Sequence, residues 1–499
     1  MKENSFLKNS VLLTASNITT GILGFIFSIY LSKLIGPVGM GLYGLVMPIY
    51  NLFICLMTAG IIAAISQISA IYKSKGQYNN INKTIKSVAS FNIIWAIAIG
   101  VMVFFLAPYI SKYGIHDMRT INAIRITCPA MVFIALSNIL KGYFYGTSKI
   151  VVPSFIDILE KAMRIITITI LIFIFKATSI TSLVTLAYLS LAIGELQSLV
   201  LLFIYYKNLR KKVPPSNDKP ERVSQLLFNV LVIALPLCLN GFLGNLFGTA
   251  STLLVPRRLA AAGFDAATAL GMIGKFTGMA LTIVAFPMIV IMSINSLIVP
   301  DLSETISRRD YYNASIRIKK VMKIAFLLGL ATTVLCNLIP DSLGQMFYGR
   351  DDLGNYIKIA SLSAPILFTS STMFGILNGL NKQGIILRNS LIVSGIELVL
   401  LFFFIGLPGV NIMGYGITLF ITSSISLFIN LREVQKHIYL NLSLSNVIIF
   451  ILLAILIFMI LRGLTSNIFN DFMTIKNIAL ILIIFLTFTG LSFFGIEEE

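Results

Sequence analysis

Charged side chains are scarce in this sequence, and their scarcity sets its class. Asp, Glu, Lys and Arg make up 12% of the 499 residues, whereas 57% are hydrophobic. A typical soluble protein has about 25% charged and about 45 to 50% apolar residues. We therefore expect the chain to be solvated by lipid rather than by water.

Histidine and paired cysteines are nearly absent as well. His116 and His437 are the only histidines, and both lie in expected loops. These residues provide neither a Ser-His pair nor a zinc site, so we expect no metal, no cofactor and no enzymatic activity. The four cysteines lie singly in apolar runs without a CxxC spacing, which predicts buried free thiols at Cys55, Cys128, Cys238 and Cys336.

Acidic residues are also few, which leaves a formal net charge of +18. In a soluble protein this charge would point to nucleic acid. Here the basic residues lie in short loops between apolar runs. We therefore attribute the excess to membrane topology and to contact with anionic lipids, and we expect no nucleic-acid partner.

What the sequence has in abundance is long apolar runs. A helix needs about 20 apolar residues to cross the hydrocarbon core, and runs of that length recur throughout. They predict an all-α integral membrane fold of about 14 transmembrane helices. The first run is too long for a signal-peptide core and is expected to remain as a span. The expected segments are 6–35, 41–72, 87–111, 120–145, 152–175, 181–206, 224–255, 266–299, 321–339, 356–380, 385–406, 413–431, 444–461 and 475–494.

The basic residues test this map, because hydropathy alone placed the segments. With the N-terminus in the cytoplasm, 24 Lys and Arg fall on the cytoplasmic side, nine on the outer side and five within spans. Cytoplasmic loops of membrane proteins carry such an excess. The bias predicts a multi-pass protein of the cytoplasmic membrane with both termini in the cytoplasm.

One long polar connection, residues 207–222, contains Pro214, Pro215 and Pro220 and divides the helices into six and eight. We expect an N-lobe at 1–206, a cytoplasmic linker at 207–223, a C-lobe at 224–440 and two accessory helices at 441–499. At an offset of 237, residues 139–142 lie over 376–379, and Glu160 lies over Glu397. This similarity predicts two parallel six-helix lobes around a central cavity.

Four charged residues share one stripe of the helix expected at 152–175. Asp157, Glu160, Lys161 and Arg164 are spaced i, i+3, i+4 and i+7, which predicts the pairs Asp157–Lys161 and Glu160–Arg164. The pairs could neutralise one another and hold the helix in the bundle. Alternatively, they could line a hydrated cavity in which Arg164, about 16 Å deep at 1.5 Å per residue, binds phosphate.

Four further ionisable residues lie within expected spans, where such residues generally face a cavity or a partner. Arg125 and Lys275 have no acidic neighbour at helical spacing, so each either needs an anion from elsewhere or extends its side chain to the outer surface. Glu195 and Glu397 are single carboxylates at mid-span that could pair with these cations or take up protons. Together with the four residues above, they are the candidate substrate-binding residues.

A set of short segments carries a family resemblance. They are Phe-Leu-Lys at 6–8, Ile-Gly at 35–36 with Gly-Leu-Tyr at 41–43, Leu-Lys-Gly-Tyr-Phe-Tyr-Gly at 140–146, Leu-Glu at 159–160 with Arg-Ile at 164–165, Gly-Glu at 194–195 and Ile-Asn-Ser-Leu-Ile-Val-Pro at 294–300. Together they resemble the multidrug/oligosaccharidyl-lipid/polysaccharide (MOP) exporter superfamily, and within it the stage V sporulation protein B group of polysaccharide flippases. The resemblance spans nearly the whole chain.

This resemblance implies a V-shaped pair of six-helix lobes, alternating access, and a pyrophosphate-sugar head carried through a cationic cavity. It also implies two further helices that, in lipid II flippases, help to form a groove for the polyprenyl tail. Those relatives carry arginines in helix 1, whereas residues 16–25 of this chain contain none. The sporulation branch implies a supply of precursor for spore-cortex peptidoglycan.

The expected function is therefore the flipping of a lipid-linked sugar precursor, with a lipid-linked oligosaccharide or lipid II-like substrate and membrane lipids as partners. The energy source stays open between chloride, sodium, protons and the membrane potential. A multidrug or cation antiporter of the same superfamily is the alternative, although the helices expected before residue 145 contain no acidic residue at mid-span. A membrane scaffold for wall or sporulation enzymes is a further alternative, for which the short loops leave little surface.

Overall fold

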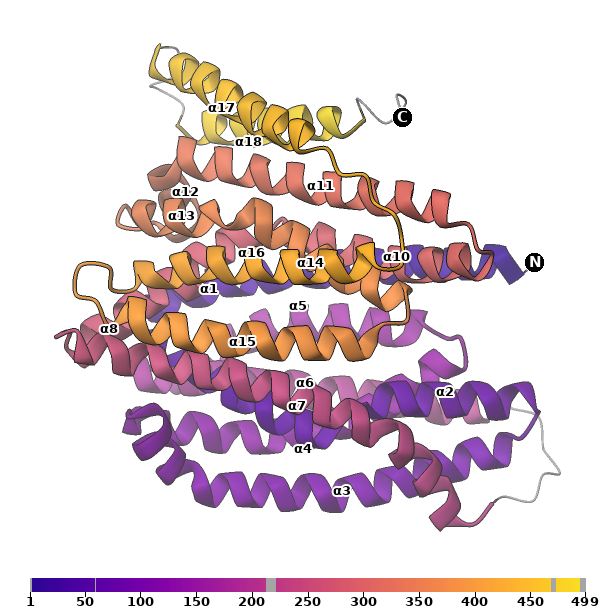
Figure 1. The fold of residues 1–499 in the computed structure, drawn as a ribbon. Helices are drawn as coiled ribbons and strands as arrows, with labels where there is room; N and C mark the ends of the chain where they lie inside the picture. The colour runs from indigo at the N-terminus through magenta and orange to yellow at the C-terminus, as the bar shows by residue number, and fades with distance from the viewer. Residues whose placement is uncertain (1, 59, 212–220, 468–472, 494–499) are drawn as a thin grey trace. The chain divides into compact units, whose positions relative to one another are not determined.

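The computed structural model describes residues 2–58, 60–211, 221–467 and 473–493, and nearly all of them are helical (Figure 1). Within these ranges there is no β-strand. The predicted all-α membrane fold is confirmed. The helices are α1 (Lys2–Thr58), α2 (Ile61–Ser74), α3 (Tyr78–Tyr109), η1 (Ile110–Ile115), η2 (Met118–Thr120), α4 (Ile121–Gly146), α5 (Val151–Phe175), α6 (Ile180–Arg210), α7 (Val223–Ala261), α8 (Ala266–Ile273), η3 (Gly274–Ala280), α9 (Leu281–Ala285), α10 (Met288–Ser307), α11 (Tyr311–Leu338), α12 (Pro340–Tyr348), α13 (Gly354–Leu362), α14 (Ala364–Gly379), α15 (Gln383–Ile405), α16 (Met413–Gln435), α17 (Leu444–Asn467) and α18 (Met473–Phe493).

The number of spans differs from the predicted 14. Within the described ranges, 11 helices are long and apolar enough to cross a membrane, and the pair α13 and α14, bent by 49°, makes up to 12. The stretch Leu12–Ser74 counts once, although its 63 residues far exceed the length of one span. Helix α5 carries four charged residues, and α18 has a described apolar stretch of only Lys476–Ser492. Conversely, the span expected at 266–299 is interrupted at Pro287.

Helix α1 is two helices joined at Gly36. This residue has φ 65° and ψ −175°, a conformation that glycine adopts readily because it has no Cβ. The break separates the segments expected at 6–35 and 41–72. A second break precedes α2, whose N-cap Gly60 also has a positive φ, of 78°.

Contacts divide the chain into two compact units. Unit 1 comprises Met1–Ile35 and Leu42–Leu253, and unit 2 comprises Gly36–Gly41 and Leu254–Glu499. This division falls inside α7 and not in the polar connection. The expected domain boundaries stay a prediction, and residues 212–220 of the linker and 468–472 and 494–499 of the accessory segment lie outside the described residues.

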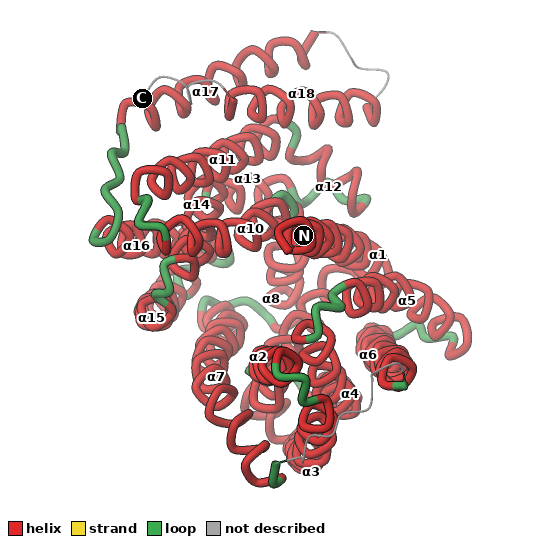
Figure 2. The backbone as a smooth tube through the Cα atoms, turned by 90° about the vertical axis from the view of Figure 1, so that its right-hand side faces the viewer, coloured by secondary structure: helices red, strands yellow, loops and turns green. Residues whose placement is uncertain are grey.

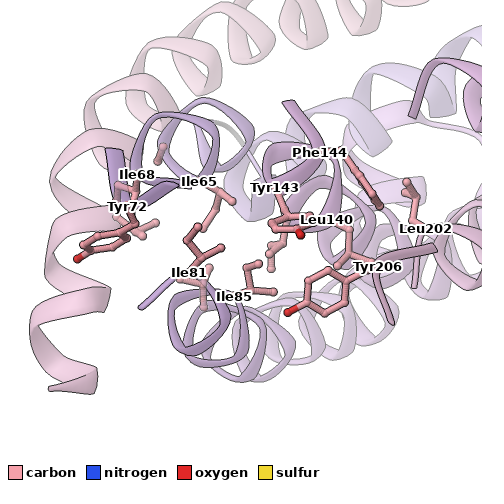
Figure 3. Packing of buried hydrophobic residues seen from close by; sticks show 14 of the residues in the cluster. Ile65, Ile68, Tyr72, Ile81, Ile85, Leu140, Tyr143, Phe144, Leu202 and Tyr206 are labelled. Carbon is pink, nitrogen blue, oxygen red and sulfur yellow. The ribbon is translucent and has the colours of Figure 1, made fainter. Parts of the chain in front are cut away.

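In unit 1, α4 packs against α2, α3 and α6 around an apolar core. Figure 3 shows side chains from all four helices meeting there, among them Ile65, Ile85, Tyr143 and Leu202. The rings of Tyr143 and Tyr206 meet edge to face at 5.0 Å. This packing fixes α4 and α6, which flank the charged helix α5.

In unit 2, α14 packs against α10, α11 and α16 around a second apolar core. Helices α17 and α18 lie beside α11, as Figures 1 and 2 both show. The described parts of the expected accessory helices thus contact unit 2 through α11.

The two units repeat one packing detail. A Cβ added at Gly142 of α4 would meet the carbonyl oxygen of Ile62 and Cβ of Ile65, both at 2.9 Å. A Cβ added at Gly379 of α14 would meet the residues 237 positions further on, at 3.0 Å from Leu302 Cβ and 3.2 Å from Val299 O. Small residues let membrane helices approach closely. The repeat predicted from the sequence therefore extends to matching helix contacts.

Candidate functional site

The charged stripe of α5 forms different ion pairs from those predicted. Asp157 pairs with Lys141 of α4 at 2.7 Å, and Glu160 pairs with Lys161 at 2.9 Å. The predicted pairs Asp157–Lys161 and Glu160–Arg164 are wrong, because neither occurs among the ion pairs of the described residues. Spacing along one helix could not reveal that the neighbouring helix α4 supplies a lysine.

Arg164 extends from α5 toward α1. Its side chain is only 7% exposed, and Nη2 donates to the hydroxyl of Tyr43 at 2.9 Å. The guanidinium carbon lies 4.3 Å from the centre of the Phe27 ring, within cation–π range. Nε has no hydrogen-bond partner in the described structure. Arg164 is thus held by aromatic residues and not by a direct ion pair.

Tyr43 is itself held in place from α6. Its ring stacks on that of Tyr188 at 4.8 Å, and the Tyr188 hydroxyl donates to the carbonyl oxygen of Tyr43 at 2.7 Å. Both contacts orient the phenol that receives the Arg164 hydrogen bond. The position of the Arg164 guanidinium is therefore fixed by residues of α1 and α6 as well as by its own helix.

Two buried carboxylates lie near this arginine. Glu160 on α5 and Glu195 on α6 are 5% and 8% exposed, and Gly194 lets α6 approach Glu160 closely. Within the described residues, Oε1 of Glu160 and the buried hydroxyl of Tyr50 have no hydrogen-bond partner. Tyr50 is within electrostatic range of Glu160, Glu195 and Arg164. We call the set Tyr43, Tyr50, Glu160, Lys161, Arg164, Tyr188 and Glu195 the Arg164 cluster.

Three further candidate residues, Arg125, Glu397 and Lys275, do not belong to this set. Arg125 of α4 lies over the ring of Phe104, with 4.9 Å from its guanidinium carbon to the ring centre. Glu397 is a half-buried residue of α15 in unit 2. Lys275 of η3, also in unit 2, has no acidic neighbour at helical spacing, and it pairs instead with Asp352 at 2.6 Å. Its partner is 77 residues away in the sequence.

Asp352 lies in the connection before α13 and receives two cations. Arg350 donates two hydrogen bonds to it, at 2.8 and 2.7 Å. The hydrogen bonds from Arg350, and after them the one from Lys275, hold the pKa of Asp352 below its ordinary value. This group is therefore an anion under physiological conditions.

Sequence reasoning missed Tyr43, Tyr50, Tyr188 and Lys141. Tyr43 and Lys141 stand in motifs that were noted for other reasons, but no periodicity connects position 43 with position 164. A search of the described residues finds no group of three or more His, Cys, Asp or Glu that could hold a metal ion.

The family model described as polysaccharide biosynthesis protein matches residues 6–306, more than half of the chain. The chain belongs to this family. Stage V sporulation protein B of Bacillus subtilis (strain 168) is 26% identical over 424 residues, covering 84% of this chain and 81% of the relative. The lipid II flippase MurJ of the same organism is 24% identical over 419 residues, covering 80% and 77%.

Solved structures share the fold of this polysaccharide biosynthesis family member. A lipid II flippase MurJ structure in an inward closed conformation has a TM-score of 0.72 at 14% identity, covering 97% of this chain and 98% of that one. An inward-facing multidrug resistance MATE family transporter of the MOP superfamily has a TM-score of 0.64 at 14% identity, covering 86% and 98%. The chain is a multi-pass helical membrane protein of the polysaccharide biosynthesis family, and it shares the fold of these transporters.

Proposed function

We propose that this transporter flips a lipid-linked sugar precursor of the polyprenyl-pyrophosphate class across the cytoplasmic membrane by alternating access. Both termini lie in the cytoplasm, and the precursor serves wall or spore-cortex peptidoglycan or a related polysaccharide. Membership of the polysaccharide biosynthesis family supports this proposal. So do the names of two relatives, a stage V sporulation protein and a lipid II flippase.

The observation that carries the proposal is the setting of Arg164. A cation inside a membrane helix costs about 2.5 to 3.5 kcal/mol on insertion scales, so it needs a compensating partner. With the described residues, this guanidinium forms one side-chain hydrogen bond, to the neutral Tyr43, and its Nε donates to none. Guanidinium binds phosphate through two parallel N–H donors, so a pyrophosphate would accept the hydrogen bonds that Arg164 does not make to the described residues.

The position of Arg164 also bears on the first helix. Residues 16–25 carry no charge, yet the guanidinium reaches Phe27 further along α1. Helix α5 thus brings a cation beside α1 that α1 lacks in this segment. This arrangement keeps a pyrophosphate-linked substrate compatible with a first helix that has no arginine. The other candidate residues, Arg125, Lys275 and Glu397, stay secondary in the proposal.

One observation favours the second candidate, a cation antiporter. Such a transporter needs buried acidic groups, and the segments expected before residue 145 contain none at mid-span. Glu160 and Glu195 on α5 and α6 are buried in the same unit, and Oε1 of Glu160 has no hydrogen-bond partner among the described residues. A cation or a proton could bind there. Together with Asp157 and Lys141, the Arg164 cluster contains three acidic and three basic residues. Its formal net charge is zero and favours neither the flippase nor the antiporter.

The test is the flipping of a fluorescent polyprenyl-pyrophosphate sugar in proteoliposomes. Arg164→Gln removes the charge and keeps a polar side chain. The matched control is Arg308→Gln, because Arg308 is an exposed residue that pairs with Glu304 on its own helix. Arg350 is a poorer control, since it shares Asp352 with Lys275.

We expect wild type and Arg308→Gln to flip the lipid and Arg164→Gln to lose most of the activity. Glu160→Gln with Glu195→Gln separates the two candidates. If wild type moves no lipid-linked sugar but expels an organic cation, and this double variant abolishes the export, the protein is an antiporter.

A further inference from the structure

Unit 1 contains a cavity of about 500 Å³ that shares no lining residue with the Arg164 cluster. It is lined by the end of α1, the first turns of α2, the C-terminal half of α4 and one turn of α7. Gly60 forms part of its wall, where a Cβ would lie 2.6 Å from the carbonyl oxygen of Ala234 on α7. The volume falls within the range of about 300 to 1,000 Å³ that is usual for small-molecule sites.

The polar groups of this cavity are uncharged and available. Ser66, Asn138 and Tyr145 line it, and no side chain of the three forms a hydrogen bond with another described residue. Asn138 as a whole is only 8% exposed, but its amide atoms are not among the fully buried polar atoms without a partner. The amide is therefore accessible from the cavity, where it can donate to and accept from a ligand. Thr58 adds a hydroxyl whose hydrogen is donated to Ile54 and whose lone pairs stay free.

The chemistry of the lining selects an uncharged ligand that both donates and accepts. Hydroxyl and amide groups do both, as do the hydroxyls of a sugar. Among the described residues, no Lys, Arg, Asp or Glu lines the cavity, which gives a phosphate no counter-charge there. Ile62, Ala63 and Leu237 supply an apolar wall against the face of a ring or an acetyl methyl group.

This cavity lies next to the charged residues of α4 and α5. Tyr145 is within electrostatic range of both members of the Lys141–Asp157 ion pair. Lys141 is in turn within range of Glu195 in the Arg164 cluster. The cavity and the Arg164 cluster are therefore both neighbours of the Lys141–Asp157 ion pair.

We propose that the cavity between α2, α4 and α7 binds the uncharged sugar ring of the lipid-linked precursor, with Asn138 and Tyr145 as its hydrogen-bonding residues. The inference rests on the proposed function and adds to it a subsite for the sugar. Arg164 recognises the pyrophosphate, and the cavity recognises the ring attached to it.

Two probes that differ only in the sugar test this assignment. One is a short-chain prenyl pyrophosphate carrying a single N-acetylglucosamine, and the other is the same prenyl pyrophosphate without the sugar. Binding is measured with the purified full-length protein in nanodiscs for wild type, Asn138→Leu, Tyr145→Phe and Arg164→Gln. Tyr143→Phe is the matched control, because Tyr143 lies on the same helix but packs against Tyr206 in the core (Figure 3).

We expect Asn138→Leu and Tyr145→Phe each to weaken binding of the sugar probe by about 2- to 12-fold, the loss of one neutral hydrogen bond. Neither should change binding of the sugarless probe, and Tyr143→Phe should change neither probe. Arg164→Gln should weaken both probes. Equal affinity of wild type for the two probes, or equal weakening of both by Asn138→Leu, would overturn the sugar subsite and leave the proposed function intact. Failure of wild type to bind either probe would instead refute the proposed function.

A second readout does not depend on the stability of the Asn138 variant. Ser66→Cys, in a background with Cys55→Ser and Cys238→Ser, places a thiol in the cavity wall for maleimide labelling. Free N-acetylglucosamine should slow this labelling in proportion to its concentration. Protection by added phosphatidylglycerol, without protection by the sugar, would overturn the assignment and make the cavity an acyl-chain site.

Discussion

Removing the Tyr43 hydroxyl should destabilise unit 1 through Arg164. Tyr43→Phe keeps the ring that stacks on Tyr188 at 4.8 Å and deletes the oxygen that accepts the Arg164 hydrogen bond at 2.9 Å. Hydrogen bonds to charged groups contribute about 1.5 to 3 kcal/mol, whereas those inside membrane proteins average about 0.6 and reach about 1.7 kcal/mol. Arg164 is only 7% exposed and cannot recover the bond from water. We therefore expect a loss of about 1 to 2 kcal/mol.

A double-mutant cycle isolates this interaction. The free energy of unfolding is measured by SDS titration in mixed micelles for wild type, Tyr43→Phe, Arg164→Gln and the double variant. We expect a coupling of about 1 kcal/mol, because either single change already breaks the bond. The control cycle combines Arg164→Gln with Tyr206→Phe, whose hydroxyl donates to Asn82 in another part of the unit.

The control cycle should be additive within about 0.5 kcal/mol, as is usual for residues without shared partners. Additivity in the Tyr43 cycle as well would refute the argument that Tyr43 holds Arg164. A coupling of similar size in both cycles would show a general loosening of the unit, which also contradicts a direct interaction.

Three further predictions concern ion pairs and helix contacts. Asp157→Asn should destabilise the protein by about 2 to 4 kcal/mol, because it leaves the partly buried Lys141 without its partner. Asp157→Leu with Lys141→Met should cost less than the single change in the same SDS titration. Gly142→Ala should cost about 1 to 3 kcal/mol, because the added Cβ meets Ile62 and Ile65 at 2.9 Å, whereas Gly24→Ala, with nothing within 4 Å, should cost far less by thermal unfolding. The pKa of Asp352 is lowered in the folded protein, so its ion pairs stabilise the fold above the unfolded pKa of about 3.9. This stabilisation is lost as the pH falls below that value. The difference in unfolding temperature between wild type and Asp352→Asn should therefore be constant from about pH 5 to 8 and shrink below about pH 4.

Most of the fold prediction followed from the length of the apolar runs. The expected segments coincide with helices because a chain in lipid must satisfy its backbone hydrogen bonds within each helix, and this requirement depends on local sequence. The number of spans was predicted less accurately. Gly36 and Pro287 interrupt helices, and hydropathy does not register a break that leaves both halves apolar.

The candidate site was predicted in part. Four charges on one stripe of α5 follow from the helical period, and three of the four lie in or beside the Arg164 cluster as ion pairs or hydrogen-bonding groups. The partners did not follow from it. Lys141 reaches Asp157 from α4, and Asp352 reaches Lys275 from 77 residues away, so both pairs depend on which helices are neighbours.

The sequence by itself determined that this protein lies in a membrane, that its helices repeat at an offset of 237, and that α5 carries charge into the bilayer. Each of these properties depends on residues that are close together in the sequence or regularly spaced along it. Only the tertiary structure decided that Arg164 meets Tyr43 and Phe27 of α1, and that Asn138 faces a cavity beside α2 and α7. Side chains on different helices come together through packing, and packing depends on the shapes of all the surrounding residues at once.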